Sequence, residues 1–270
     1  MINDKNLFKK YLSLLGIAEA SPSRELLNKI VKAHLIKVPF ENISKLLFKQ
    51  RGMKNKPDLA EFLEGIEKYN FGGTCYSNNY YLFLLLQHLG FDIKLCGCNM
   101  KNSDVHLISI VKIEGNEYIV DGGYAAPFLN PLPTNLSEDY IITLGNEKYI
   151  VKPKGENGKT RVEQHYNGKL QHWYTAGTKP RKIEEFSKVI ADSYTDNAVF
   201  MNAVRITRFT GGGAMVLKNF IFTEINNNET ITKKLTRDEL QDFIEAKFHM
   251  PVGLVRHAVN SIKELKDIYV

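Results

Sequence analysis

The chain has 270 residues, of which 43% are hydrophobic and 24% are charged, a composition typical of a globular protein with a substantial core. Its longest apolar run, YYLFLLL, is far shorter than the roughly 20 residues that a membrane-spanning helix needs, and its first residues lack the apolar stretch of a signal peptide. The net charge is +6, but the lysines are scattered, so we expect a cytoplasmic protein that binds neither membranes nor nucleic acid.

Cysteine usage points to a free thiol. The chain contains three cysteines, Cys75, Cys96 and Cys98, an odd number in a sequence without an evident export signal, so we expect no disulfide framework. Cys96 and Cys98 form a C-x-C pair, but no second cysteine pair completes a zinc site, and we expect no bound metal. A functional role for one free thiol is therefore conceivable.

The N-terminal part of the sequence shows the apolar periodicity of helices. Residues 4–15 carry apolar side chains three to four positions apart and precede Gly16, a residue type that commonly ends helices. A second helix is predicted over 21–38, with Ser21 as its N-cap and Pro22 as its first residue.

Two further helices are predicted before the pattern changes. The third, over 57–69, carries Asp58 and Glu61 at the spacing of a capping box. The fourth starts near Cys75 and ends at Gly90, and its apolar run predicts burial on most sides.

After Gly90 apolar residues recur at every second position, which is typical of β-strands. Strands are predicted over 92–100, 105–113, 117–123, 139–144, 148–153, 160–166 and 170–176. A helix is predicted over 182–194 and a closing helix over 236–248. Strand segments are predicted between them, over 203–209, 214–225 and 230–235. The chain is therefore predicted to be α+β, with a helical region, a β region and a mixed α/β region that span residues 1–91, 92–180 and 181–270.

The stretch FGGTCYSNN, residues 71–79, brings Cys75 through a glycine turn to the start of a helix. Glycines allow a tight turn and leave room for a substrate to approach the next residues. A cysteine in the first helical turn faces unpaired N–H groups and the positive end of the helix dipole, which favour a thiolate. This placement suits a nucleophile, although a plain buried cysteine at a helix start fits the same pattern.

Partners for such a nucleophile stand on the predicted hairpin that follows. His106 begins one strand and Asp121 ends the next. A turn at 114–115 would pair Ile108 with Asp121 and place His106 one diagonal step away on the same face, whereas a turn at 115–116 would increase the offset. The pair would then complete a Cys-His-Asp relay, in which aspartate orients the imidazole and the imidazole takes the thiol proton. A strand-end histidine and a turn aspartate without function remain the alternative.

Four segments in order resemble the arylamine N-acetyltransferases. FGGTCYSNN resembles their Gly-Gly-x-Cys segment, with Asn79 at the family's asparagine position. HLISIV resembles their catalytic-histidine strand, YIVDGGY their Asp-x-Gly-Phe segment, and HLIKVPFENIS their Pro-Phe-Glu-Asn motif. Residues 179–200 and 210–217 also follow the pattern of their third domain, so the resemblance covers nearly the whole chain.

The resemblance implies an acetyl-CoA-dependent acetyltransferase with a cysteine-protease-like triad. Its parts would be a helical bundle that carries Cys75 as nucleophile, a β-barrel that carries His106 as base and Asp121 as orienting acid, and an α/β lid. Phe40 and Tyr124 would line an apolar acceptor pocket, although Phe40 fits equally well as a core aromatic residue. The resemblance also places a segment near coenzyme A that by itself indicates only a flexible turn: Thr210, Gly211, Gly212 and Gly213.

The expected reaction is double displacement, as in xenobiotic metabolism. Acetyl-CoA would acylate Cys75, and an arylamine or hydrazine would then take the acetyl group. One alternative uses the same acyl-enzyme for thioester hydrolysis or for amide synthesis on a larger acyl chain, as in related macrolactam-forming enzymes. Another is a degenerate family member that binds a ligand without catalysis.

Phe71 is the clearest departure from the family pattern. Relatives have arginine immediately before Gly-Gly, and that arginine typically pairs with the glutamate that corresponds to Glu41. Since a buried unpaired carboxylate is costly, we expect Glu41 to accept hydrogen bonds from backbone N–H groups near residues 71–75 or to find another cation. Phe71 is expected to fill the vacated space with apolar contacts.

Overall fold

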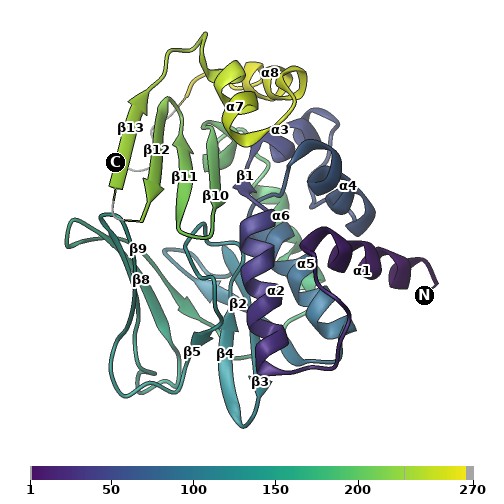
Figure 1. The fold of residues 1–270 in the computed structure, drawn as a ribbon, viewed down its shortest axis with the longest axis vertical. Helices are drawn as coiled ribbons and strands as arrows, with labels where there is room; N and C mark the ends of the chain where they lie inside the picture. The colour runs from purple at the N-terminus through teal and green to yellow at the C-terminus, as the bar shows by residue number, and fades with distance from the viewer. Residues whose placement is uncertain (1, 228, 266–270) are drawn as a thin grey trace.

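The computed structural model describes residues 2–227 and 229–265 and shows a helical part beside two antiparallel sheets (Figure 1). The first 90 residues form the helices that the sequence predicts and one more between the second and third of them. Their bounds are α1 (Ile2–Leu15), α2 (Arg24–Lys37), α3 (Ile43–Gln50), α4 (Leu59–Tyr69) and α5 (Cys75–His88). No helix among the described residues is both long and apolar enough to span a membrane.

The helix ends follow local sequence signals, with one correction. Gly16 follows α1 with a φ of +67°, a conformation that glycine adopts without strain. Asp58 caps α4, because its carboxylate accepts from the Glu61 amide at 2.8 Å. The prediction that Ser21 caps the second helix is wrong: α2 starts later, and the Ser23 hydroxyl accepts from the Leu26 amide at 3.1 Å. Ser23 thus has the spacing that an N-cap bond requires.

The central part of the chain forms an eight-stranded antiparallel sheet that curls into a nearly closed barrel. Its strand order is β5-β4-β3-β2-β9-β8-β7-β6. The strands are β2 (Asp92–Asn99), β3 (His106–Ile113), β4 (Asn116–Val120), β5 (Leu132–Pro133), β6 (Tyr140–Leu144), β7 (Glu147–Val151), β8 (Arg161–Tyr166) and β9 (Lys169–Ala176).

The last part of the chain forms a five-stranded sheet with helices at its end. Its strand order is β1-β10-β11-β12-β13, so the first strand comes from the helical part of the sequence. The strands are β1 (Phe40–Glu41), β10 (Arg205–Phe209), β11 (Gly213–Lys218), β12 (Ile221–Asn226) and β13 (Glu229–Lys234). The helices are η1 (Ile183–Phe186), α6 (Ser187–Asp192), η2 (Val199–Met201), α7 (Leu240–Phe248) and α8 (Val252–Asn260).

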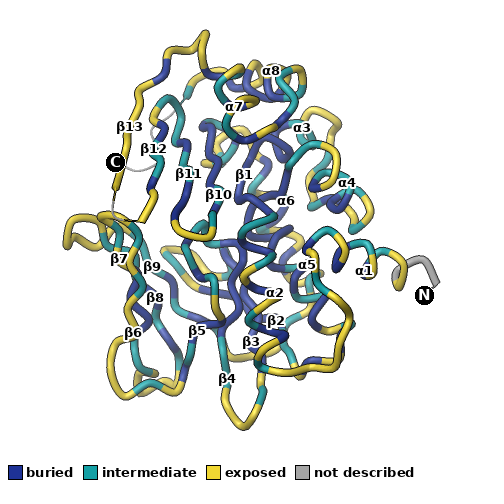
Figure 2. The backbone as a smooth tube through the Cα atoms, viewed as in Figure 1, coloured by how far each residue is buried: buried dark blue, intermediate teal, exposed yellow. Residues whose placement is uncertain are grey.

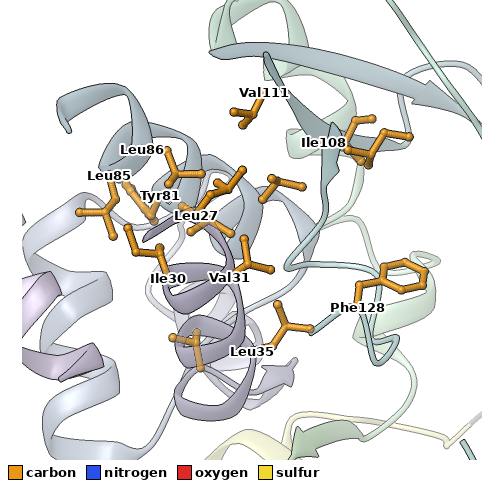
Figure 3. Close-up of a cluster of buried hydrophobic side chains, with 14 of the residues drawn as sticks. Leu27, Ile30, Val31, Leu35, Tyr81, Leu85, Leu86, Ile108, Val111 and Phe128 are labelled. Carbon is orange, nitrogen blue, oxygen red and sulfur yellow. The ribbon is translucent and has the colours of Figure 1, made fainter. Parts of the chain in front are cut away.

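The main core lies where α2 and α5 pack against the barrel. Figure 3 shows side chains from both helices in one cluster with β3 and the loop after β4: Leu27, Ile30, Val31, Leu35, Tyr81, Leu85, Leu86, Ile108, Val111 and Phe128. In Figure 2, α5 and the strands beside it are mostly dark blue, which marks buried residues. Since burying one large apolar side chain contributes about 1.5–3 kcal/mol, this cluster fixes α5, and with it Cys75, against the barrel.

A second core joins the helical part to the five-stranded sheet. Ile43 and Leu46 of α3 and Phe71 pack with apolar side chains from β10–β12, α7 and α8. The helices α3 and α8, which have 8 and 9 residues and no side-chain cap bond, are not predicted from the sequence. Helices this short are marginal alone, so their packing against one another and the sheet accounts for them.

Candidate active site

Cys75 is the first residue of α5, and two glycines position it. A Cβ on Gly72 would lie 2.0 Å from the carbonyl oxygen of Pro39, and a Cβ on Gly123 would lie 2.7 Å from Cα of Cys75. Both are far closer than side-chain carbons approach backbone atoms, so both positions require glycine. The turn before Cys75 is therefore held against the loop after α2, and the loop after β4 passes directly beside the cysteine backbone.

His106 and Asp121 meet as the hairpin spacing predicts. β3 and β4 pair with Ile113 opposite Asn116, so the turn is at 114–115. His106 Nε2 and Asp121 Oδ2 are 2.8 Å apart, and both side chains are buried. Because Nε2 faces the carboxylate, Nδ1 is the ring nitrogen left for the Cys75 side chain, with which His106 also forms a hydrogen bond.

Asn79 holds the other oxygen of the Asp121 carboxylate. It lies one turn after Cys75 on α5 and donates from Nδ2 to Oδ1 of Asp121 at 2.9 Å and to the Leu107 carbonyl at 2.6 Å. Its Oδ1 accepts from the Gly122 amide at 2.6 Å. One side chain therefore ties α5 to β3 and to the loop after β4, and holds the cysteine helix and the aspartate in register.

The electrostatics of the site favour a protonated imidazole. Burial lowers the pKa of His106, but the charge and hydrogen bond of Asp121, together with the hydrogen bond and charge of Cys75, outweigh it and raise that pKa to about 10. Burial alone would raise the pKa of Asp121, yet His106, Asn79 and the Gly123 amide lower it. At neutral pH the arrangement is therefore suited to an imidazolium beside a carboxylate.

The other two thiols lie in a different environment. Cys96 and Cys98 are buried in β2. Burial raises the pKa of Cys96 to about 11, and burial and the nearby Asp121 raise the pKa of Cys98 well above its ordinary value. Both thiols are thus neutral at physiological pH, which disfavours nucleophilic chemistry.

A family model described as N-acetyltransferase matches residues 24–257, which is most of the chain. The chain belongs to the arylamine N-acetyltransferase family.

Relatives of this family member are distant in sequence but extensive in coverage. Proansamycin X synthase from Amycolatopsis mediterranei (strain S699) is 27% identical over 66% of this chain and 70% of its own length. Arylamine N-acetyltransferase 1 from Oryctolagus cuniculus is 25% identical over 85% of this chain and 88% of its own. The chain is thus an enzyme of a transferase family.

Solved structures of the family share the fold. The arylamine N-acetyltransferase from Mycobacterium abscessus superposes with a TM-score of 0.79 at 17% identity, covering 95% of both chains. An arylamine N-acetyltransferase from Bacillus cereus superposes with a TM-score of 0.71 at 20% identity over 90% of this chain and 98% of its own, and its structure is described as having a Cys-His-Glu catalytic triad. The predicted α+β architecture of bundle, barrel and lid is confirmed.

In this N-acetyltransferase family member, aromatic side chains surround the imidazole. The ring of Tyr124 lies 5.6 Å from that of His106 and 4.9 Å from that of Tyr174. The Tyr124 hydroxyl is 2.7 Å from Nδ1 of His172, so a polar pair stands where an apolar wall is expected from the family's phenylalanine. Phe40 is buried against Phe200, with ring centroids 5.5 Å apart, and its strand bridges to Gly73 in the cysteine turn.

The glycine-rich turn predicted to approach coenzyme A lies between β10 and β11. The amide of Thr210 donates to the Gly213 carbonyl at 2.9 Å, which closes the turn. Gly211, Gly212 and Gly213 line a cavity of about 320 Å³ with residues from β6 and from the loop after Tyr124. No hydrogen bond joins this turn to Cys75, His106 or Asp121 in the described part of the chain, so its role stays a prediction.

The described residues hold no cluster of three or more histidine, cysteine, aspartate or glutamate side chains that could bind a metal ion.

Glu41 accepts a hydrogen bond from a backbone amide near residues 71–75, as predicted from the sequence. Its Oε1 accepts from the Gly72 amide at 3.1 Å and from the Ser44 hydroxyl at 2.5 Å, and its Oε2 accepts from the Ser44 amide at 2.9 Å. Phe71 is buried and packs with Ile43 and Leu46, as expected for an apolar replacement of arginine. Burial raises the pKa of Glu41, although these hydrogen bonds oppose the shift.

Sequence reasoning missed Lys45, which lies in α3 and is only 5% exposed. Its Nζ donates to the Ser193 hydroxyl at 2.6 Å and lies 4.5 Å from the ring centre of Tyr194. Burial lowers the pKa of Lys45 to about 8, while the charge of Cys75 opposes this shift. Nothing in the sequence distinguishes this lysine from the exposed ones, because its helix forms only through tertiary packing.

His34 lies behind the site and is expected to make folding sensitive to acid. Its Nδ1 meets the Tyr11 hydroxyl at 2.8 Å, and burial lowers the pKa of His34 to about 3. An unfolded histidine takes up a proton below about pH 6.5 and the folded one does not, so stability is lost as pH falls through that value. Between about pH 7.5 and 5, we expect His34 to account for about 2 kcal/mol of lost stability.

Urea denaturation of wild type and His34→Gln at both pH values measures this loss. The difference between the two proteins isolates His34 from His106, whose raised pKa acts in the opposite direction over the same range. Parallel pH dependences in the two proteins would contradict the prediction.

Proposed function

We propose that this protein transfers an acetyl group from acetyl-CoA to an arylamine or hydrazine through a thioester on Cys75. The observation that carries the proposal is the buried chain of contacts from Cys75 through His106 to Asp121. Membership of the arylamine N-acetyltransferase family and the names of the relatives support acetyl-CoA and an arylamine as the substrates. The net charge of +6 is compatible with a phosphorylated co-substrate such as coenzyme A.

In the first half-reaction the Cys75 thiolate attacks the carbonyl carbon of the acetyl thioester. The bond to the coenzyme A sulfur breaks, and the departing thiolate takes a proton from the His106 imidazolium. Acylation removes the charge of Cys75, one of the interactions that raise the pKa of His106. The neutral imidazole that results is then available as a base.

In the second half-reaction the acceptor amine attacks the acetyl carbonyl of the Cys75 thioester. His106 takes the proton that the nitrogen loses, the carbon–sulfur bond breaks, and the thiolate–imidazolium pair is restored. Asp121 holds the imidazole tautomer and stabilises its charge in both halves. Tyr124 and Phe40 are proposed to line the acceptor pocket, and the turn at Thr210–Gly213 to approach coenzyme A.

Intact-mass measurement after incubation with acetyl-CoA tests the acyl-enzyme. We expect one added acetyl group on the wild type and none on Cys75→Ala, because Cys75 alone stands at a helix start beside His106. Cys96→Ala is the matched control and should be labelled as the wild type is, since burial keeps that thiol neutral. Labelling that persists in Cys75→Ala would end the proposed mechanism.

Amide synthesis on a larger acyl chain is the second candidate, because one relative at 27% identity is named a synthase rather than an acetyltransferase. Both functions use the same thioester on Cys75, so the acyl-enzyme alone does not separate them. Turnover of acetyl-CoA with an arylamine, and without it, separates acetyl transfer from hydrolysis. Acetylation of the amine at a rate above hydrolysis supports the first function. Stable acyl-enzyme with no acetyl transfer to amines would favour the synthase.

A further inference from the structure

We propose that Lys45 is a positioning residue for the reaction, whose buried ammonium stabilises the Cys75 thiolate from α3 while His106 does so from β3. This inference deepens the proposed function and rests on it for the role of the thiolate. It concerns a residue that lies outside the Cys-His-Asp arrangement and that the sequence motifs do not mark.

The burial of Lys45 is the first observation. Lysine is almost never fully buried unless it is paired, because removing an ammonium from water is costly. Lys45 is 5% exposed, yet among residues 2–227 and 229–265 no carboxylate forms an ion pair with it. A hydroxyl and an aromatic face, from Ser193 and Tyr194, are its close contacts. Such a charge needs an anion nearby, and the nucleophile is the candidate.

The placement of Lys45 brings its charge to the cysteine side of α5. Tyr194, whose ring lies under the Lys45 ammonium, belongs to the same buried cluster as Cys75 and Tyr76. The Ser193 hydroxyl that accepts from Lys45 donates in turn to the Ile190 carbonyl, so the ammonium is held in one position. Cys75 is the ionisable group that favours the charged form of Lys45 among the described residues.

The other titratable groups near the pair do not supply that anion. Tyr76 and Tyr194 are neutral at physiological pH, because burial raises the pKa of each. Glu41, the acid nearest in sequence, directs both oxygens to Ser44 and Gly72 rather than to Lys45. From the β side, His106 and Cys98 face Cys75, and of these only His106 carries a charge. The thiolate is thus flanked by two cations of different elements.

The two cations, the His106 imidazolium and the Lys45 ammonium, have different roles in this arrangement. His106 gives and takes the proton, so its charge disappears when the amine is deprotonated. Lys45 exchanges no proton in the cycle, and its charge stays in place while the carbon–sulfur bond to Cys75 breaks. A fixed cation at this point stabilises the sulfur anion that leaves, which assists deacylation as well as the resting thiolate.

The pH profile of Cys75 alkylation by iodoacetamide tests the proposal without acetyl-CoA. We expect Lys45→Met, which keeps the shape and removes the charge, to slow alkylation about tenfold near pH 6 while reaching the wild-type rate at high pH. Lys45→Arg, which keeps a cation, should retain most of the low-pH rate. Lys49→Met is the matched control, one turn further along α3 in a partly exposed pair with Asp196, and should leave the profile unchanged.

An unchanged alkylation profile in a folded Lys45→Met protein would overturn the proposal.

Carbon-13 NMR of the lysine Cε signals is a second test, which measures the titration of Lys45 without changing that residue. In Cys75→Ser the anion is lost, so Lys45 should titrate at a lower pH than in the wild type while Lys49 does not move. Equal titration of Lys45 in both proteins would also overturn it. If Cys75 of the wild type is alkylated normally but is not acetylated by acetyl-CoA, the proposed function is contradicted, whereas the test of Lys45 remains valid.

Discussion

Asp121→Asn is expected to lower the rate of acetyl transfer by about 10⁴-fold while leaving the fold intact, by analogy with the same change in serine-protease triads. The reason is the set of donors around the carboxylate. Asn79 Nδ2 and the Gly123 amide both donate to Oδ1. An asparagine satisfies them only with its oxygen, which turns its NH₂ group toward Nε2 of His106. The imidazole must then accept at Nε2 and carry its proton on Nδ1, the nitrogen needed to take the proton from Cys75.

Two measurements check this expectation. kcat/KM for acetylation of an arylamine should fall by about 10⁴-fold, and Cys75 alkylation at neutral pH should slow as the imidazolium is lost. Asp139→Asn removes a partly exposed carboxylate that pairs with Lys152, so it is the matched control and should retain wild-type activity. A loss below tenfold with an unaltered alkylation profile would show that Asp121 does not set the tautomer.

Glu41→Ala is expected to lower the free energy of unfolding by about 3 kcal/mol or more. The change leaves the buried Gly72 and Ser44 amides without an acceptor, and each unsatisfied donor costs about 1–3 kcal/mol. The cavity left by the side chain adds to this loss. Gly72 lies in the turn before Cys75 and packs closely against the Pro39 carbonyl. Because Glu41 holds the Gly72 amide, loss of this hydrogen bond is expected to loosen the turn.

Urea denaturation measures the loss, and Glu41→Gln separates hydrogen bonding from charge. Glutamine keeps an oxygen for the Gly72 amide but faces the Ser44 amide with its own NH₂ group, so we expect an intermediate loss of about 1–2 kcal/mol. Glu64→Ala, at a surface position paired with Lys68, is the control and should change stability little. A Glu41→Ala protein within about 1 kcal/mol of wild type would contradict a structural role for this carboxylate.

Local sequence signals suffice to predict most of the helices and strands and to single out the candidate triad. The glycine turn and the apolar run placed Cys75 at the start of a buried helix. The alternation of the hairpin, together with a two-residue turn, predicts that His106 and Asp121 lie on one face of the sheet. These features follow from short-range geometry, because a strand register and a helix start depend on residues close in sequence. The family resemblance then ordered the remaining segments.

The groups that surround the triad, by contrast, depend on how distant elements pack together. α3 and α8 lack side-chain cap bonds and form against the sheet, so the burial of Lys45 and its contact with Ser193, 148 positions away, are invisible in the sequence. The bond between Tyr124 and His172 joins residues 48 positions apart in the same way. Burial and charge proximity depend on how distant elements pack, and a single sequence carries no record of that distance. The residue proposed to tune the thiol is therefore visible only in the fold, whereas the residues of the candidate triad are visible in the sequence motifs.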